Sequence, residues 1–355
     1  MNCKYIGIRR ALIVIQFIFI LLITLSPLSN ARAQNKESVA ISDLKAGDSI
    51  YIITNREIDT TKKELSFHSK VSEESTLTFL KVTLNQSLEM VSHLFSQADF
   101  MSEVSVKTSE WLLFIHGDGK TYNESVQRGL DIQNTHNVNV IVFSWPSELP
   151  DINGLKNFKN SERNVVKSVD HFKQLLSFMK DFKESNSAYQ ESANLSMFLH
   201  SLGNLHLKKL VDSTNSDRVY DTIFENLIIN SAAVNRKNHE EWVEKLDFQK
   251  RIYITNNHYD YSLKGLHIYT KHGNQLGEEF SGPSAKNANY VHFTEAVGFR
   301  TPTSNTHTYF IGDIPQQSRN IRNFYFDVLH GNKINFSDSS QFVKRNEGVG
   351  YDIVF

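Results

Sequence analysis

Six short apolar runs, separated by longer segments, constrain the fold of this chain more than any other feature of its sequence. They cover residues 111–115, 140–144, 195–199, 226–230, 251–255 and 289–293. Short continuous apolar runs are typical of strands that are covered on both faces, as in a parallel sheet. Segments of helix length lie between several of these runs. Strand alternating with helix predicts a doubly wound, mostly parallel α/β sheet with right-handed connections and helices on both faces.

The clearest of the expected helices covers residues 161–182. Its apolar side chains recur at spacings of four, three, four and three, at Val165, Val169, Phe172, Leu176 and Met179. Such spacing places them on one face, which would pack against the sheet. A further helix is expected over residues 316–329, at the end of the α/β region.

Two more strands are expected before the six runs, over residues 49–54 and 76–84. In the second of them, Leu77 and Phe79 alternate with threonines, the pattern of a half-buried strand. A helical stretch should follow, because four apolar side chains would share one helix face, namely Leu88, Val91, Leu94 and Ala98.

The N-terminus has the pattern of a secretory signal peptide. Lys4, Arg9 and Arg10 precede an apolar run over residues 11–25, and an A-x-A site ends before Gln34. A positive start, a short apolar region and small residues before the cut define such signals, so we expect export to the periplasm or out of the cell. The alternative is an uncleaved membrane anchor, for which the apolar run is short.

The sequence therefore divides into a signal peptide, 1–33, strands and a helix that join the sheet, 34–107, an α/β catalytic core, 108–331, and a C-terminal tail, 332–355. The tail is either flexible or a final strand pair. The only cysteine, Cys3, lies in the signal segment, so the mature chain would use neither disulfides nor thiolate metal sites. The formal net charge of −1 gives no indication of a nucleic-acid partner.

A serine follows the third apolar run directly, in the sequence NLSMFLHSLGNLHLKKL over residues 194–210. Ser201 would lie at the carboxyl end of a strand, in the turn to a helix, with Gly203 two residues later. This is the context of a nucleophile elbow, G-x-S-x-G, in which a sharp turn projects the hydroxyl and the next N–H group, here that of Leu202, towards substrate. Leu199 replaces the first glycine of that pattern. The alternative is a serine that merely caps a helix.

A glycine-rich segment follows the first apolar run and consists of His116, Gly117, Asp118 and Gly119. An H-G turn at this place supplies the second N–H group of an oxyanion hole in folds with a nucleophile elbow, most naturally from Asp118. Glycine also allows backbone donors to approach a substrate oxygen closely. The alternative is a turn that only ends a strand.

An aspartate and a histidine follow later strands in the order that such a fold requires. Asp260 comes after residues 251–255, and His307 lies in the loop after residues 289–293. His307 would accept the proton of Ser201, and Asp260 would hold its ring. Asp260 is alternatively a turn residue, or a metal ligand with His258, although no third ligand lies nearby. His292, inside a predicted strand, is expected to be a packed core residue.

Together these motifs resemble a bacterial, esterase- or lipase-like α/β-hydrolase family of unknown function. The matching sequences are TNRE at 54–57, FIHG at 114–117, SWPS at 144–147, HSLGN at 200–204 and HTYF at 307–310. The resemblance spans about residues 50–329 and implies an α/β-hydrolase fold. Its catalytic triad falls on Ser201, Asp260 and His307. Among the other matched residues, Trp145 is expected to pack the loop and Arg56 to have a structural role beside a carboxylate.

The sequence thus predicts an exported serine hydrolase that acts on a small-molecule or lipid-like carboxylic ester or a related acyl compound. Neither a metal nor an organic cofactor is implied, and no stable membrane span is expected after signal cleavage. Two alternatives remain open. An amidase or peptidase would use the same triad, and a non-catalytic binding protein would keep only the scaffold. The oligomeric state is left open.

Overall fold

The computed structural model describes residues 44–105, 110–152, 154–185, 194–213, 222–270, 273–280, 282–298, 305–346 and 348–355. The predicted signal peptide, residues 1–33, lies outside this part of the chain. None of the helices in the described ranges has the length and apolar content that a bilayer span needs.

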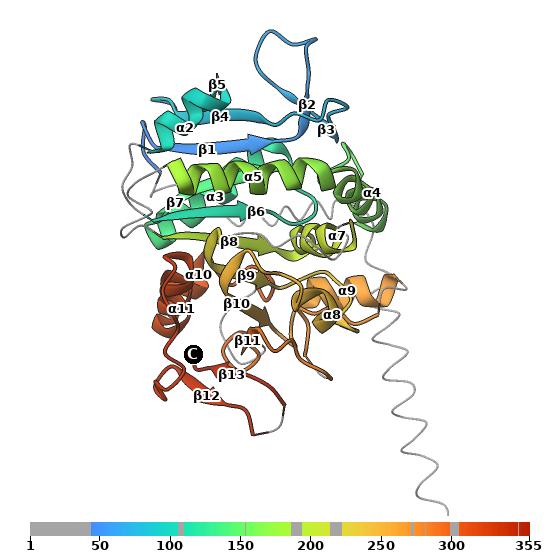
Figure 1. Cartoon of the computed structure of the whole chain (residues 1–355), viewed down its shortest axis with the longest axis vertical. Coiled ribbons are helices and arrows are strands. Elements are labelled where there is room, and N and C mark those ends of the chain that lie inside the picture. The colour runs from blue at the N-terminus through green and yellow to red at the C-terminus, as the bar shows by residue number, and fades with distance from the viewer. Residues whose placement is uncertain are drawn as a thin grey trace, which may run out of the picture. The chain divides into compact units, whose positions relative to one another are not determined.

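A large twisted sheet forms the centre of the described chain (Figure 1). The six predicted runs are all strands of it: β6 (Trp111–Ile115), β7 (Asn139–Ser144), β8 (Leu195–His200), β9 (Phe224–Asn230), β10 (Gln249–Asn256) and β11 (Ala288–His292). Further strands extend it at both edges: β1 (Ser49–Thr54), β4 (Thr78–Leu84), β5 (Met90–Phe95), β12 (Phe342–Lys344) and β13 (Tyr351–Ile353). Their order among the described residues is β12-β13-β11-β10-β9-β8-β6-β7-β1-β4-β5.

The predicted parallel pairing is confirmed for the central strands, from β11 across the sheet to β1. Only the edges are antiparallel, where β4 pairs with β1 and β5, and β12 with β13. A separate short hairpin consists of β2 (Arg56–Ile58) and β3 (Phe67–Val71).

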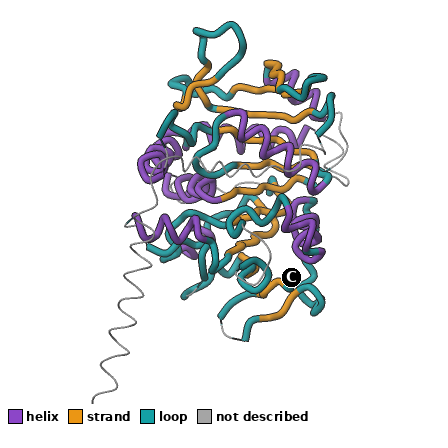
Figure 2. The backbone as a smooth tube through the Cα atoms, turned by 180° about the vertical axis from the view of Figure 1, so that it is seen from behind, coloured by secondary structure: helices purple, strands orange, loops and turns teal. Residues whose placement is uncertain are grey.

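Helices cover both faces of the sheet (Figures 1 and 2). One face packs against α3 (Tyr122–His136), α10 (Asp313–Gln317) and α11 (Arg319–Leu329). The other packs against α2 (Gln97–Ser105), α4 (Gly154–Lys167), α5 (Val169–Ser185), α7 (Leu205–Ser213), α8 (His239–Val243) and α9 (Tyr261–Tyr269). Successive residues of a strand therefore enter different cores: Trp111 and Leu113 face one, Leu112 and Phe114 the other. This double coverage explains why the strands are continuous apolar runs.

The two helices predicted in the core region are each interrupted by a serine. The helix expected over 161–182 is divided at Ser168 into α4 and α5. The Ser168 hydroxyl donates to the Asn164 carbonyl at 2.7 Å and accepts from Asn55 Nδ2 at 2.7 Å, so this side chain competes with the regular helix pattern. Similarly, the helix expected over 316–329 is divided at Ser318, whose hydroxyl caps α11.

The helical stretch predicted around Leu88, Val91, Leu94 and Ala98 is wrong for the first three residues, whereas Ala98 lies in α2. Residues 90–95 form β5, which pairs antiparallel with β4. The Asn85 side chain accepts from the N–H groups of Ser87 and Glu89, and Leu88 has a φ of 60°, so a tight turn replaces the helix. β5 lies at the edge of the sheet, where Leu94 is 56% exposed. The few apolar residues of this strand fit the periodicity of a helix as well as that of a strand, which explains the error.

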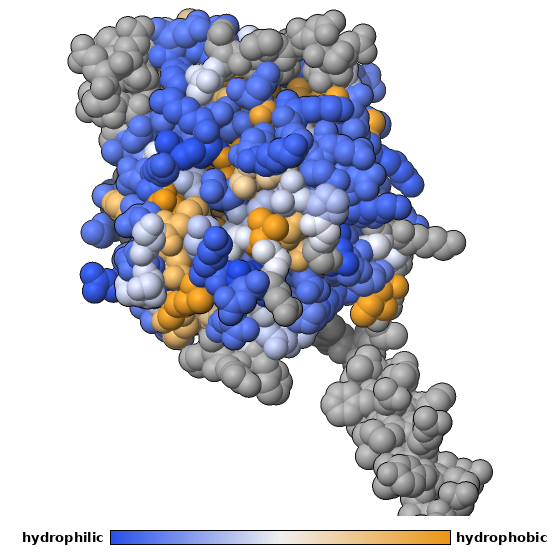
Figure 3. Space-filling view, turned by 60° about the horizontal axis from the view of Figure 1, so that its bottom comes forward, coloured by the Kyte–Doolittle hydropathy of each residue, from blue (hydrophilic) through white to orange (hydrophobic). Residues whose placement is uncertain are grey.

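The C-terminal segment forms the final strand pair rather than a free tail. β13 pairs in parallel with β11, and β12 pairs with β13. Figure 3 brings the end of the molecule at the bottom of Figure 1 forward, and apolar surface appears there in separate groups among hydrophilic residues. The N-terminal and C-terminal segments thus form the two edges of the sheet, and the strands next to the site lie at its centre.

Phe198 in β8 offers a test of this core. It is fully buried, and its ring centroid lies 4.8 Å from that of Phe310 and 5.7 Å from that of Phe114. Phe198→Ala should lower the free energy of unfolding by about 3–5 kcal/mol, because it removes apolar burial and leaves a cavity. Phe326→Ala, at a residue 43% exposed, is the matched control and should cost less than about 1 kcal/mol in the same urea titration. Equal losses would contradict the assigned core.

Candidate active site

The strand order changes direction at β6, and a ligand site is expected beside the carboxyl end of this strand. From β6 the chain continues to β7 on one side, and it returns to β8 on the other. In α/β sheets, ligands bind beyond the carboxyl ends of the strands at such a point. Ile115 pairs with Leu199 across β6 and β8, so the loop that begins at His116 lies beside the turn that contains Ser201.

Ser201 occupies a sharp turn between β8 and the helical segment that follows. Its φ is 52°, a conformation that is uncommon for a residue other than glycine and that marks functional turns. A short 3₁₀ turn, Ser201–Asn204, leads directly into α7. Leu199, which replaces the usual glycine, is fully buried beneath the turn. The predicted strand-turn-helix geometry is therefore present with leucine at this position.

Two glycines allow the loop after β6 to touch the Ser201 turn. A Cβ atom on Gly203 would lie 2.7 Å from the His116 carbonyl oxygen and 2.9 Å from that of Ile115. A Cβ atom on Gly117 would lie 2.8 Å from Ser201 Cβ. Any side chain at either position would separate the two backbone segments, so their contact depends on glycine.

Asn204 fixes the same turn from inside. Its Nδ2 atom lies 3.1 Å from the Leu199 carbonyl oxygen, 3.0 Å from that of Ser201 and 3.1 Å from that of Asn230. These bonds join the end of β8 to β9 and satisfy carbonyl groups that would otherwise be buried without a partner. Asn204 lies in the predicted HSLGN motif, but the sequence predicts no role for it.

His116 orients the loop that contains Asp118. The Trp145 N–H donates to His116 Nε2 at 3.2 Å, so the proton of the neutral ring is on Nδ1, which donates to the Gly117 carbonyl at 2.9 Å. Burial, with Arg56 nearby, holds the pKa of His116 well below its usual range and keeps the ring neutral. Because the peptide bond is planar, fixing the Gly117 carbonyl also fixes the opposed N–H group of Asp118.

Arg56 supports this loop from the other side. Its Nη2 atom donates to the carbonyl oxygens of Lys120 at 2.8 Å and Trp145 at 2.7 Å, and its Nε atom donates to Ser144 Oγ at 3.1 Å. The expected structural role is thus confirmed, but with carbonyl and hydroxyl acceptors in place of a carboxylate. Trp145 is fully buried and stacks on the His116 ring at 5.4 Å, in agreement with the expected packing role.

Asp260 and His307 form a hydrogen-bonded pair. Asp260 Oδ2 lies 2.6 Å from His307 Nδ1, and the Asp260 side chain is fully buried. Asp260 Oδ1 accepts from the Leu263 N–H at 3.0 Å and caps α9, so the turn role considered for this residue exists beside the pairing. Because Nδ1 faces a carboxylate it carries the proton, which leaves Nε2 able to accept one.

Ser201, His307 and Asp118 line one pocket of about 460 Å³. The rest of its wall is mostly apolar and comes from α4, α9 and the loop after β9, through Leu155, Phe158, Ala233, Leu263 and Leu266. Ser201 and His307 are not directly hydrogen-bonded, and such bonds often tighten only when substrate is bound. The structure therefore brings together the four predicted residues Ser201, Asp260, His307 and Asp118.

A polar network beneath the pocket contains residues that the sequence does not identify. Asn230 Nδ2 faces His200 Nδ1 at 3.2 Å, and the His200 ring lies 4.6 Å from that of His307. Ser231 Oγ faces the His307 carbonyl at 3.2 Å and the Tyr309 hydroxyl at 3.0 Å. The network therefore holds the His307 loop against the ends of β8 and β9. His200 and Tyr309 lie in the HSLGN and HTYF motifs, whereas Asn230 and Ser231 have only the polar end of the run NLIIN as a signal in the sequence.

The sequence suggests roles for two other histidines, namely His292 as a core residue and His258 as a metal ligand. His292 is buried and pairs with the Asn256 side chain and the Val349 carbonyl, which confirms it as a core residue. Asp260 faces His307, while His258 lies 3.4 Å from Glu279. Among the described residues, no group of three or more histidine, cysteine, aspartate or glutamate side chains is placed to hold a metal.

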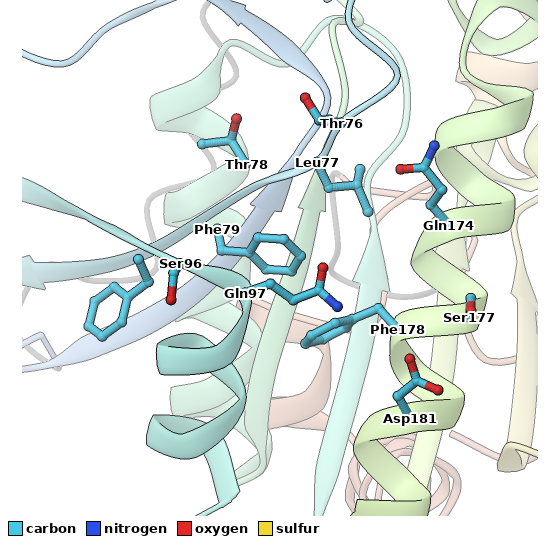
Figure 4. Close-up of a pocket in the computed structure, with 11 residues that line it drawn as sticks. Thr76, Leu77, Thr78, Phe79, Ser96, Gln97, Gln174, Ser177, Phe178 and Asp181 are labelled. Carbon is cyan, nitrogen blue, oxygen red and sulfur yellow. The ribbon is translucent and has the colours of Figure 1, made fainter.

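A second cavity, of about 500 Å³, is lined by residues of β4, the start of α2 and α5, and Ser201 is not among them (Figure 4). The rings of Phe79 and Phe178, 5.0 Å apart, form its apolar part, and Gln97 and Gln174 are among its polar residues. Its lining residues include no histidine. Ser201 and His307 therefore line the 460 Å³ pocket and not this cavity.

Gly203→Ala tests the contact between the two loops. The added methyl group would meet the backbone carbonyls of Ile115 and His116, which cannot move aside as a flexible side chain would. We expect a loss of about 1–3 kcal/mol in the free energy of unfolding. Gly265→Ala in α9 is the control, because its methyl group would meet no atom within 4 Å and alanine favours helices. Chemical denaturation measures both, and an unchanged Gly203→Ala variant would disprove the close contact.

The match to a protein-family model agrees with this architecture. The sequence model of the family "Alpha/beta hydrolase of unknown function (DUF900)" matches residues 93–278, about half of the chain. No curated protein matches. An acylaminoacyl peptidase from Pyrococcus horikoshii has 10% identity and a TM-score of 0.34, with 83% of this chain and 44% of that chain covered.

Phospholipase PlaB from Legionella pneumophila has 10% identity and a TM-score of 0.33, with 69% of this chain and 68% of that chain covered. The chain thus spans less than half the length of the peptidase, and at these values neither likeness indicates a substrate. The family match covers β6 to β10 with the turn of Ser201 and the loop of Asp260. The chain belongs to the α/β-hydrolase family of unknown function that this model describes.

Proposed function

We propose that the protein is an exported serine hydrolase that cleaves a carboxylic ester or a related acyl compound. One observation carries the proposal: His307, which is hydrogen-bonded to Asp260, lines the same pocket as Ser201, and Ser201 stands in a turn of positive φ. A nucleophile, a base and a residue that orients the base are the three parts of nucleophilic catalysis by serine. Export rests on the signal pattern of residues 1–33.

In the proposed first half-reaction, His307 Nε2 takes the proton of the Ser201 hydroxyl as Oγ attacks the acyl carbon. Asp260 holds Nδ1 and stabilises the imidazolium that forms. The tetrahedral intermediate then collapses, the bond to the leaving group breaks, and His307 returns the proton to that group. Water repeats the sequence on the acyl-enzyme and releases the acid.

The negative oxygen of the intermediate would bind between the N–H groups of Leu202 and Asp118. The contact between Gly117 and Ser201 and the His116 bond to the Gly117 carbonyl support this assignment, because they bring the two backbone segments together in a fixed orientation. Such donors are effective because they are oriented before charge develops, and the loss of one typically raises the barrier by about 3 kcal/mol.

Covalent labelling tests whether Ser201 is a nucleophile. A fluorophosphonate probe should label the purified wild type and leave the Ser201→Ala variant unlabelled, as intact-protein mass spectrometry can show. Ser262→Ala removes another hydroxyl from the same pocket and should retain labelling. A folded wild type that stays unlabelled would instead support the alternative of a non-catalytic binding protein on this scaffold.

The base is tested separately. His307→Ala should lower kcat/KM for a p-nitrophenyl ester by at least about 10³-fold, because Ser201 would lose its proton acceptor. His258→Ala, at an exposed histidine near the same loop, should change the rate by less than about twofold. Normal turnover by the His307 variant, with an unchanged circular dichroism spectrum, would mean that another group is the base. Matched ester and amide substrates would separate an esterase from an amidase or peptidase.

A further inference from the structure

One acidic residue, Asp118, lies in the wall of the otherwise mostly apolar pocket. Among the described residues that line it, Asp118 is the only acid, and neither lysine nor arginine occurs. Leu155, Phe158 and Leu266 contribute apolar wall. A charged group in such surroundings favours a ligand that carries the opposite charge, because water solvates the charge less well there than in bulk.

The partners of the Asp118 carboxylate are uncharged. Asn157 Nδ2 donates to Asp118 Oδ1 at 3.0 Å, and Asn157 is itself held by the Leu149 N–H and the Ser147 carbonyl. Burial raises the pKa of Asp118 to about 6, opposed by hydrogen bonds from Ser161, Asn157 and Gly119. The group is therefore mostly ionised at pH 8. Asn157, which is 3% exposed, fixes its position.

Asp118 lies close to Ser201 in the fold, so its charge would act on a substrate bound there. Asp118 follows Gly117, whose backbone contacts Ser201. In the proposed reaction, negative charge develops on a substrate oxygen near this carboxylate, and two like charges repel each other across a poorly solvated pocket. A positive group on the substrate would offset that repulsion and would itself be attracted to Asp118.

We propose that Asp118 selects substrates that carry an alkylated ammonium group close to the scissile acyl bond. This inference rests on the proposed function of the same pocket. The methyl or methylene groups of such a cation would contact the apolar wall, while its charge would face the carboxylate. The same arrangement disfavours acyl compounds with an anionic group at that place.

Two thioesters of nearly the same shape test the selection at pH 8. Acetylthiocholine carries a trimethylammonium group, and in 3,3-dimethylbutyl thioacetate a neutral tert-butyl group replaces it. The wild type should show a kcat/KM at least about tenfold higher for the cationic ester, the size of a moderate charge interaction. Asp118→Asn retains the shape of the side chain and should reduce this ratio to about one. Asp170→Asn, at an exposed acid on α5, should leave the ratio unchanged.

A binding measurement on the wild type keeps the test independent of variant folding. Tetramethylammonium should slow fluorophosphonate labelling of Ser201, whereas tert-butanol at the same concentration should not. A ratio near one in the wild type, an undiminished ratio in Asp118→Asn, or no protection by tetramethylammonium would overturn the role of Asp118 while Ser201 still reacts. A wild type that fluorophosphonate does not label at all would overturn the hydrolase proposal, and with it the proposed selection of cationic substrates.

Discussion

The site depends on the direct contact of two backbone segments, the loop after β6 and the turn after β8. Gly117 and Gly203 lie at this contact, and neither has room for a Cβ atom. Parallel neighbours in a sheet end at the same edge, so pairing of Ile115 with Leu199 brings the two segments to one level. Because neither glycine carries a side chain, the two backbone segments can approach each other closely beside Ser201.

Buried polar side chains hold that contact in place. Backbone groups that leave a sheet edge lose their ladder partners and need others. Arg56 supplies donors to carbonyls of the loops after β6 and β7, and Asn204 does so at the turn after β8. Asn204 also reaches the end of β9. The φ of 52° at Ser201 persists because these bonds restrain the surrounding backbone.

The ionisable side chains at the site also have structural contacts. Asp260 is fully buried, yet one oxygen faces His307 and the other caps α9, so the carboxylate that orients the histidine also fixes a wall of the pocket. Burial keeps His116 neutral, which suits its part as one acceptor and one donor within the loop. Asp118 differs from both, because it combines partial burial with a position in the pocket wall.

The strands of the core and the order of Ser201, Asp260 and His307 can be predicted from the residues alone, because burial on both faces and position after a strand leave local patterns. It failed around Leu94, where a few apolar residues fit a helix or an edge strand equally well. Which polar groups meet, in contrast, depends on the packing of the layers. Arg56 and its acceptors Lys120 and Trp145, or Asn157 and Asp118, lie far apart in the chain. Hydrogen bonds between distant segments depend on how the layers pack, and that packing has no local signature in the residues that form them.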